Sequence, residues 1–249
     1  LPLRSAQGAD LAPLVKTGDR VTAGQAIARD AHGPFLLPAT VTGVVEELKP
    51  AAWLGSKTKV ASIRSDGSVG FQPIEGHGSA WRSLPREKLV ELLARSGLPA
   101  VPADTDHVLV HELETEAYNP SPAVVFGAWG LEAFLEGLGI VSKILPEARL
   151  HVALSRARLP LLGEIAGLAR RSGLEVNLHC AAPKYPQAHR EILLPTLFGK
   201  DMPRRALLLD AQAVFQLCDA VVSGKPPIDR IVALGGPGFS SRPHLRVRI

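Results

Sequence analysis

The chain has 249 residues, of which 46% are hydrophobic and 21% charged, with a net charge of +4 and a pI of about 9.3. This length accommodates two compact domains or one large one, and the composition is typical of a globular protein. Aromatic residues make up only 5%, and the basic residues are mostly scattered, so nucleic acid is not an expected partner. A basic surface that docks on a membrane-embedded partner is compatible with this charge.

The two cysteines, Cys180 and Cys218, are too few for an iron–sulfur cluster, which takes four protein ligands. The Cys and His positions show no zinc-type spacing. His107, His111 and His151 fall on adjacent predicted strands, but a metal site needs three or more ligands that converge, so no metal site is predicted. We expect two buried thiols in a reducing compartment. No apolar run reaches the roughly 20 residues needed to span a bilayer, and the opening Leu-Pro-Leu-Arg is not expected to be a signal peptide.

Residues 1–64 predict an all-β domain. Turn signals at Gly18-Asp19 and Ala23-Gly24 separate short strand patterns, and Pro38–Leu48 predicts a strand, a glycine turn and a second strand. This order of segments resembles the barrel-sandwich fold of biotinyl and lipoyl carrier domains. The resemblance implies a flattened β-barrel over residues 1–64.

The part of the barrel that would carry a modified lysine departs from the carrier pattern. In carrier domains the lysine lies on a hairpin between the two halves, but Asp30–Leu37 contains none. A swinging-arm function is therefore not expected. Phe35, Leu36 and Leu37 either fill the barrel or cover a partner or the next domain.

Residues 65–104 predict a linker with one helix, which Ser83 caps and Gly97 ends. From about residue 105 to 234, strands and helices alternate, which predicts βαβ units and a largely parallel sheet in a Rossmann-like α/β core. Residues 235–249 are expected to begin a further β segment. The expected fold is therefore α+β and α/β in two domains. The predicted strands are 107–111, 150–154, 174–179, 206–209 and 228–234, and the predicted helices of the core are 130–145, 159–171, 187–198 and 210–222.

Three segments carry a resemblance to one family. The strand end His111–Tyr118 is similar to an Asn-x-x-Glu-x-Glu-Pro-Tyr pattern, and Lys184–Pro203 is similar to a Lys-Tyr-Pro segment of the same proteins. Gly224–Pro237, with Arg242–Arg246 after it, is the third. The chain resembles the family that contains NqrA, from the Na⁺-translocating NADH:quinone oxidoreductase (Nqr), and RnfC, from the Rnf electron-transport complex. Because a small β-grasp domain follows the third segment in that family, we expect a truncated member.

A glycine-rich loop that holds FMN and NADH in flavin-bearing relatives has no counterpart here. Such a loop needs glycines so that backbone amides can approach phosphate. It should lie between Gly97 and Asp106, where Gly97 is the first and only glycine. The later Gly235–Gly238 predicts a turn, because no helix opens after it and Pro237 lacks an amide donor. We therefore expect neither FMN nor an iron–sulfur centre and no catalytic residue, as the resemblance to NqrA also implies.

Alternating glutamates mark the candidate ligand cleft. On an extended segment such side chains share one face, and their repulsion raises the pKa of at least one of them. They either line a cleft for a quinone headgroup at the carboxyl end of a strand or form a solvated loop. His179 and Cys180 are expected to be packing residues, because neighbours on a strand point apart. The candidate ligand-cleft residues are Glu112, Glu114, Glu116, Tyr118, Lys184 and Tyr185.

The resemblance implies a peripheral, cofactor-free component of a redox-driven ion-translocating complex on the cytoplasmic side of the cell membrane. Its partners would be the membrane subunits of an Nqr- or Rnf-type complex, with quinone as a candidate ligand. Two alternatives stay open. One is an electron-input protein similar to RnfC, with NADH and a flavin held differently, and the other is a non-enzymatic scaffold.

Overall fold

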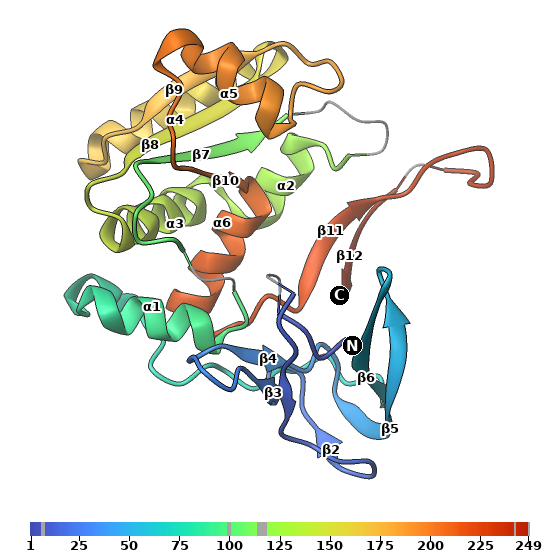
Figure 1. The fold of residues 1–249 in the computed structure, drawn as a ribbon. Helices are drawn as coiled ribbons and strands as arrows, with labels where there is room; N and C mark the ends of the chain where they lie inside the picture. Colours follow the sequence, from blue (N-terminus) through green and yellow to red (C-terminus); the bar gives the residue numbers. More distant parts are fainter. Residues whose placement is uncertain (6–7, 99–100, 114–118, 242, 249) are drawn as a thin grey trace. The chain divides into compact units, whose positions relative to one another are not determined.

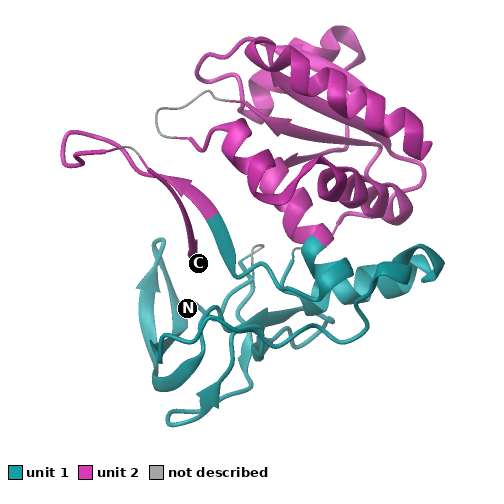
Figure 2. Cartoon of the chain, turned by 180° about the vertical axis from the view of Figure 1, so that it is seen from behind, with its two compact units in different colours: residues 1–100, 219–230, 248–249 teal, residues 101–218, 231–247 magenta. Residues whose placement is uncertain are grey.

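The computed structural model describes residues 1–5, 8–98, 101–113, 119–241 and 243–248, which form two compact units (Figure 2). Unit 1 comprises residues 1–100, 219–230 and 248–249, and unit 2 comprises residues 101–218 and 231–247. Residues 65–98, predicted as part of a linker, therefore lie in the same unit as the N-terminal β region.

Unit 1 contains two antiparallel three-stranded sheets, with strand orders β1-β3-β4 and β2-β5-β6 (Figure 1). Their inward side chains form one core that includes Leu3, Ile27 and Val45, each fully buried. Phe35 and Leu37 pack against this core, so they fill the barrel. The predicted β structure of this region is confirmed. The strands are β1 (Ala12–Pro13), β2 (Arg20–Val21), β3 (Ala26–Arg29), β4 (Leu36–Pro38), β5 (Gly43–Trp53) and β6 (Ser56–Ser65).

The remainder of unit 1 joins residues that are far apart in sequence. The amides of Ile74 and Gly78 donate to the carbonyls of Gly224 and Val221, each at 2.8 Å. Ile228 is fully buried. The helical elements of unit 1 are η1 (Ser79–Ser83), α1 (Arg86–Arg95) and η4 (Asp219–Ser223).

The predicted N-cap of the first helix is wrong. Ser83 ends η1, and its hydroxyl donates to the Ala80 carbonyl at 2.8 Å. Helix α1 starts at Arg86, with Pro85 at the N-cap position and no side-chain cap. Gly97 follows the helix at a φ of +86°, which confirms the predicted stop.

Unit 2 is built on a parallel sheet with strand order β10-β7-β8-β9. The chain passes from β7 to β8 and β9 and then returns to pair β10 on the other side of β7. The strand order therefore reverses between β7 and β10, and such a switch point is where open α/β sheets bind ligands. The strands are β7 (His107–Glu112), β8 (Arg149–Ser155), β9 (Asn177–Ala181) and β10 (Ala206–Asp210).

Helices cover this sheet. Leu193 and Leu194 of α5 pack against Leu109, Ala153 and Ala181 of the strands. Helices α3 and α6 contact each other, and α4 contacts β8 and β9. The helical elements of unit 2 are α2 (Pro122–Trp129), α3 (Leu131–Ile144), η2 (Arg156–Arg158), α4 (Leu159–Ser172), α5 (Arg190–Phe198), η3 (Gly199–Asp201) and α6 (Ala211–Cys218).

The last predicted strand exists but does not extend the parallel sheet. β11 (Asp229–Ala233) pairs with β12 (His244–Arg248) in a two-stranded sheet of its own (Figure 1). The expectation that this strand belongs to the α/β core is therefore wrong. Helix α2, by contrast, is absent from the predicted elements.

No single helix of the described ranges is both long and apolar enough to cross a bilayer. Helices α2 and α3 reach the necessary length and composition only as a pair, and they are bent by 85° where they join.

Candidate functional site

The switch point of the parallel sheet brings two carboxylates to the start of α6. Glu112 ends β7, and its Oε2 accepts a hydrogen bond from the Ala211 amide at 3.2 Å. Asp210 ends β10, and its Oδ1 accepts from the Ala213 amide at 2.7 Å, as the carboxylate of a helix cap does. Carboxylates are favourable there because the first amides of a helix have no backbone acceptor and the helix dipole is positive at that end.

His111 lies beside this pair of carboxylates. Burial lowers the pKa of its imidazole, and the Asp210 carboxylate acts in the opposite direction. Burial is the larger influence, so the ring is neutral at pH 7.

The start of α2 forms the second part of the carboxyl edge. The Ser121 amide donates to Nε2 of His244 at 3.0 Å, and Nη2 of Arg158 donates to the Ser121 hydroxyl at 3.3 Å. The first helical residue is Pro122, which has no N–H. His244 is 123 residues from Ser121, so no local pattern could have predicted this contact.

Three amides at these helix starts already have acceptors. A phosphate cradle needs free amides that point at the ligand. Amides of Ala211 and Ala213 already donate to carboxylates, and the Ser121 amide donates to an imidazole. A flavin or dinucleotide phosphate would have to displace these partners and would also meet the Glu112 carboxylate.

Gly97 and Gly235–Gly238 have structural roles in the described part of the chain. Gly97 is used to end α1, and a Cβ there would lie 2.6 Å from Cδ of Pro38. Gly235–Gly238 belong to the connection between β11 and β12, where the Phe239 amide donates to the Gly236 carbonyl at 3.2 Å. The predicted turn at this position is confirmed.

The other predicted cleft residues are only partly placed. Glu114, Glu116 and Tyr118 lie outside the described residues. Lys184 and Tyr185 follow β9 and are both exposed, and the Tyr185 ring contacts His189 edge-on at 5.7 Å. Within the described ranges, no hydrogen bond or ion pair joins either residue to Glu112.

Three histidines form a hydrogen-bonded row across the sheet. Nδ1 of His107 lies 2.9 Å from Nε2 of His151, and Nδ1 of His151 lies 2.9 Å from Nε2 of His179. The Phe198 ring of α5 contacts all three imidazoles at centroid distances of 5.0–5.6 Å. The row contains His107 and His151 but not His111, and its third member is His179.

Burial and the neighbouring His179, His107 and Arg149 lower the pKa of His151 from 6.5 to about 4. Burial also lowers the pKa of His179. Neutral imidazoles can donate and accept along such a row. Among the described residues, no group of three or more His, Cys, Asp or Glu side chains could hold a metal ion.

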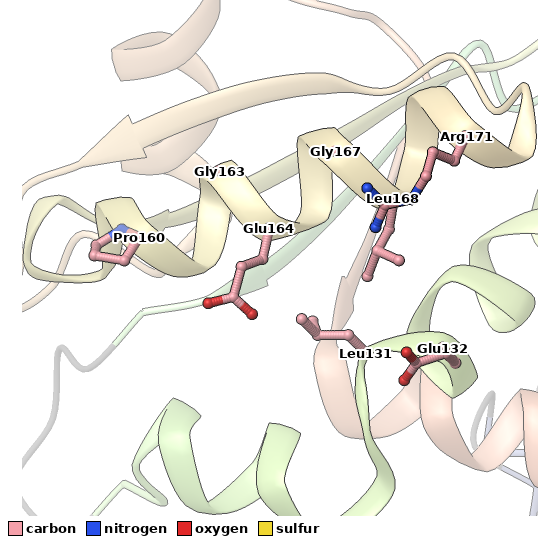
Figure 3. Close-up of a pocket in the computed structure, with 8 residues that line it drawn as sticks. All are labelled: Leu131, Glu132, Pro160, Gly163, Glu164, Gly167, Leu168 and Arg171. Carbon is pink, nitrogen blue, oxygen red and sulfur yellow. The ribbon is translucent and has the colours of Figure 1, made fainter.

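A hollow of ≈ 620 Å³ lies between α3 and α4 of unit 2. Figure 3 shows Leu131 and Leu168 facing each other across it, with the Glu164 carboxylate beside them. None of the predicted cleft residues lines it. Its remaining lining residues are Glu132, Pro160, Gly163, Gly167 and Arg171.

The N-terminal part of the chain matches a known domain family. Residues 1–68 match the model described as the RnfC barrel sandwich hybrid domain. This match agrees with the two antiparallel sheets of unit 1 and with the predicted barrel.

Curated relatives match the whole chain. The C subunit of the proton-translocating ferredoxin:NAD(+) oxidoreductase complex of Clostridium ljungdahlii is 25% identical over 274 residues, which cover 100% of this chain and 59% of the relative. The C subunit of the ion-translocating oxidoreductase complex of Rhodobacter capsulatus is 25% identical over 276 residues, covering 100% and 53%. The A subunit of the Na(+)-translocating NADH-quinone reductase of a Marinomonas species is 25% identical over 249 residues, covering 95% and 53%. The chain thus spans little more than half the length of these relatives.

Proposed function

We propose that this chain, which is similar to RnfC and NqrA over nearly its whole length, acts as a peripheral component of a membrane-bound, redox-driven, ion-translocating oxidoreductase complex. In this role it carries no electron-transfer cofactor, and it contributes to assembly and to the surroundings of a quinone. It lies at the cytoplasmic face of the cell membrane, beside the membrane subunits of the complex.

One observation carries the cofactor-free part of the proposal. The amides that open α6 are capped by Glu112 and Asp210, which belong to the same sheet edge where a nucleotide would approach. A negative pair at a helix start competes directly with a phosphate for the same donors. This arrangement supports a role closer to that of NqrA.

Quinone is the ligand that we assign to the carboxyl edge. A quinone headgroup has two carbonyl acceptors and no charge, so it suits donors such as the Lys184 ammonium and the Tyr185 hydroxyl. Both side chains are exposed. Glu112, Glu114, Glu116 and Tyr118 complete the proposed cleft.

The alternative is an electron-input role similar to that of RnfC, with FMN and NADH as ligands. The match of residues 1–68 to the RnfC barrel sandwich hybrid domain and the similarity to two C subunits support this alternative. The two roles differ in flavin content and share the membrane complex as partner.

The proposal is tested by isolating the chain with its partners. We expect affinity-tagged chain, extracted from membranes in mild detergent, to bring down Rnf- or Nqr-type integral membrane subunits identified by mass spectrometry. We expect the separately purified chain, mixed with FMN and passed through a desalting column, to show no flavin absorbance.

Retention of stoichiometric FMN would establish the alternative role. If the membrane complex is purified intact and does not contain the tagged chain, the chain is not a component of the complex in either role. An exposed, uninvolved substitution such as Val69→Ser serves as the control for tagging and extraction.

A further inference from the structure

Strands β5 and β6 form a hairpin that extends beyond the barrel core. The two strands pair from Gly43 with Ser65 as far as Trp53 with Ser56 (Figure 1). Val45 and Ala61 lie in the core, whereas most residues between Lys49 and Lys59 are exposed or half-buried. Residues 52–57, at the tip of the hairpin, are exposed or half-buried and lie outside that core.

The turn at the tip carries an unusual residue. Leu54 and Gly55, the two residues that connect the strands, have φ angles of +46° and +78°. Two positive φ values define a turn that favours Asn, Asp or Gly, and a leucine in this region is strained. Leu54 is also 91% exposed. It contributes neither packing nor turn stability to the isolated chain.

An exposed tryptophan adjoins this leucine. Trp53 is 46% exposed, although tryptophan is usually well buried in a chain of this size. Its ring has a large apolar body and one N–H donor, and such side chains collect where a membrane meets water. Trp53 and Leu54 together present an apolar tip.

The hairpin is basic. Residues 43–65 contain four basic residues, Lys49, Lys57, Lys59 and Arg64, against two acidic ones, Glu46 and Glu47. Lys49 and Arg64 form ion pairs with glutamates at the base of the hairpin. Lys57 and Lys59 are exposed near the tip and form no ion pair among the described residues.

One carboxylate lies near these lysines. Oδ1 of Asp10 accepts a hydrogen bond from the Thr58 hydroxyl at 3.0 Å, on the other face of β6 from Lys57 and Lys59. One negative charge leaves an excess of positive charge around the apolar tip. An apolar tip flanked by lysines matches the interface of an anionic bilayer. The acyl chains there contact apolar side chains, and the lipid phosphates attract lysines.

We propose that the β5–β6 hairpin is a membrane contact that inserts Leu54 and the ring of Trp53 into the headgroup–acyl boundary of an anionic bilayer. Lys57 and Lys59 then contact lipid phosphates. Two apolar side chains bury less apolar surface than an acyl chain, so this anchor is weaker than a single myristoyl chain, whose association constant is on the order of 10⁴ M⁻¹. The contact is reversible and supplements the docking of other subunits.

This inference deepens the proposed role at a membrane complex and rests on it, but its test needs no other protein. The purified full chain is sedimented with vesicles of phosphatidylcholine alone or mixed with phosphatidylglycerol. We expect binding to the anionic vesicles only, weakened by salt. In vesicles with brominated acyl chains we expect tryptophan quenching that disappears in Trp53→Ser.

The decisive variant is Leu54→Asn. Asparagine favours positive φ, so this change removes the apolar tip while it stabilises the turn. We expect it to weaken vesicle binding by about tenfold or more without lowering the melting temperature. Lys57→Gln and Lys59→Gln are each expected to weaken binding to anionic vesicles by about fivefold.

Val69→Asn is the matched control, because Val69 is an 85% exposed aliphatic residue of unit 1 outside the hairpin. It should bind like the wild type. The proposal is overturned if the wild type does not sediment with anionic vesicles, or if Leu54→Asn binds as tightly as Val69→Asn. Loss of co-purifying membrane subunits in Leu54→Asn, with no vesicle binding by the wild type, would instead assign the tip to a protein partner.

Discussion

The buried imidazole of His151 makes the stability of unit 2 depend on pH. Its folded pKa of about 4 lies below the ordinary value of 6.5, so between these values the unfolded state binds more protons than the folded state. The free energy of unfolding should therefore fall as the pH falls through this window. The expected loss is about 2 kcal/mol between pH 8 and pH 5.

Urea unfolding at pH 5, 6, 7 and 8 checks this prediction. We expect the pH dependence to become shallower in His151→Phe, which keeps an aromatic ring against Phe198 but cannot titrate. His32→Phe is the control, since His32 lies in an exposed turn of unit 1. An unchanged slope in His151→Phe would assign the pH dependence to other groups.

For individual residues, the sequence indicates which side chains are present but not which side chains they contact. Predicted strands contain His107, His151 and His179, but the row forms only because β8 pairs with both β7 and β9 in a particular register. Strand register across a parallel sheet depends on tertiary packing, so no spacing in the sequence predicts it. Asp210 was predictable because a helix cap is local.

Helices α3 and α6 approach so closely that one of them needs a glycine. A Cβ on Gly137 would lie 2.6 Å from the Val214 carbonyl oxygen and 2.7 Å from its Cγ1. We expect Gly137→Ala to lower the free energy of unfolding by about 1–3 kcal/mol, because the backbone of α6 would have to shift. Thermal and urea unfolding measure this loss.

Gly163 in α4 is the matched control for this substitution. Nothing lies within 4 Å of a Cβ built there. Since alanine favours helix over glycine, Gly163→Ala should raise stability by about 0.5–1 kcal/mol. Equal effects of the two substitutions would show that α3 and α6 are farther apart than the structure places them.

Most elements are predictable from the sequence, and the exceptions have physical causes. The helices α3 and α4 follow amphipathic patterns, and their ends match the prediction within about two residues. Helix α2 is apolar on all sides and short, so it has no helical periodicity to detect. The outer half of β5 contains Pro50. Proline has no N–H to donate to a neighbouring strand, so it usually argues against a strand at that position.

At the scale of the whole molecule, unit 1 depends on residues from the far end of the chain. Residues 219–230 supply the acceptors for Ile74 and Gly78 and the buried Ile228. A fragment of residues 1–100 should therefore keep the barrel but lose order around residues 72–98. Hydrogen exchange on the fragment and the full chain checks this expectation.

In that experiment the Ile74 and Gly78 amides should be protected only in the full chain. The Leu3 amide, which donates to the Lys59 carbonyl at 2.7 Å within the barrel, should be protected in both. Equal protection of Ile74 in fragment and full chain would show that residues 1–100 are complete without the later segment.

The return of residues 219–230 to unit 1 also sets an order of events at the ribosome. The barrel strands are translated first. Residues 219–230 are made only after residues 101–218, which delays the completion of unit 1 by on the order of ten seconds. During that interval the segment around Trp81 and α1 has no partner to cover it. Unit 1 can therefore be completed only after the strands of the α/β sheet have been translated.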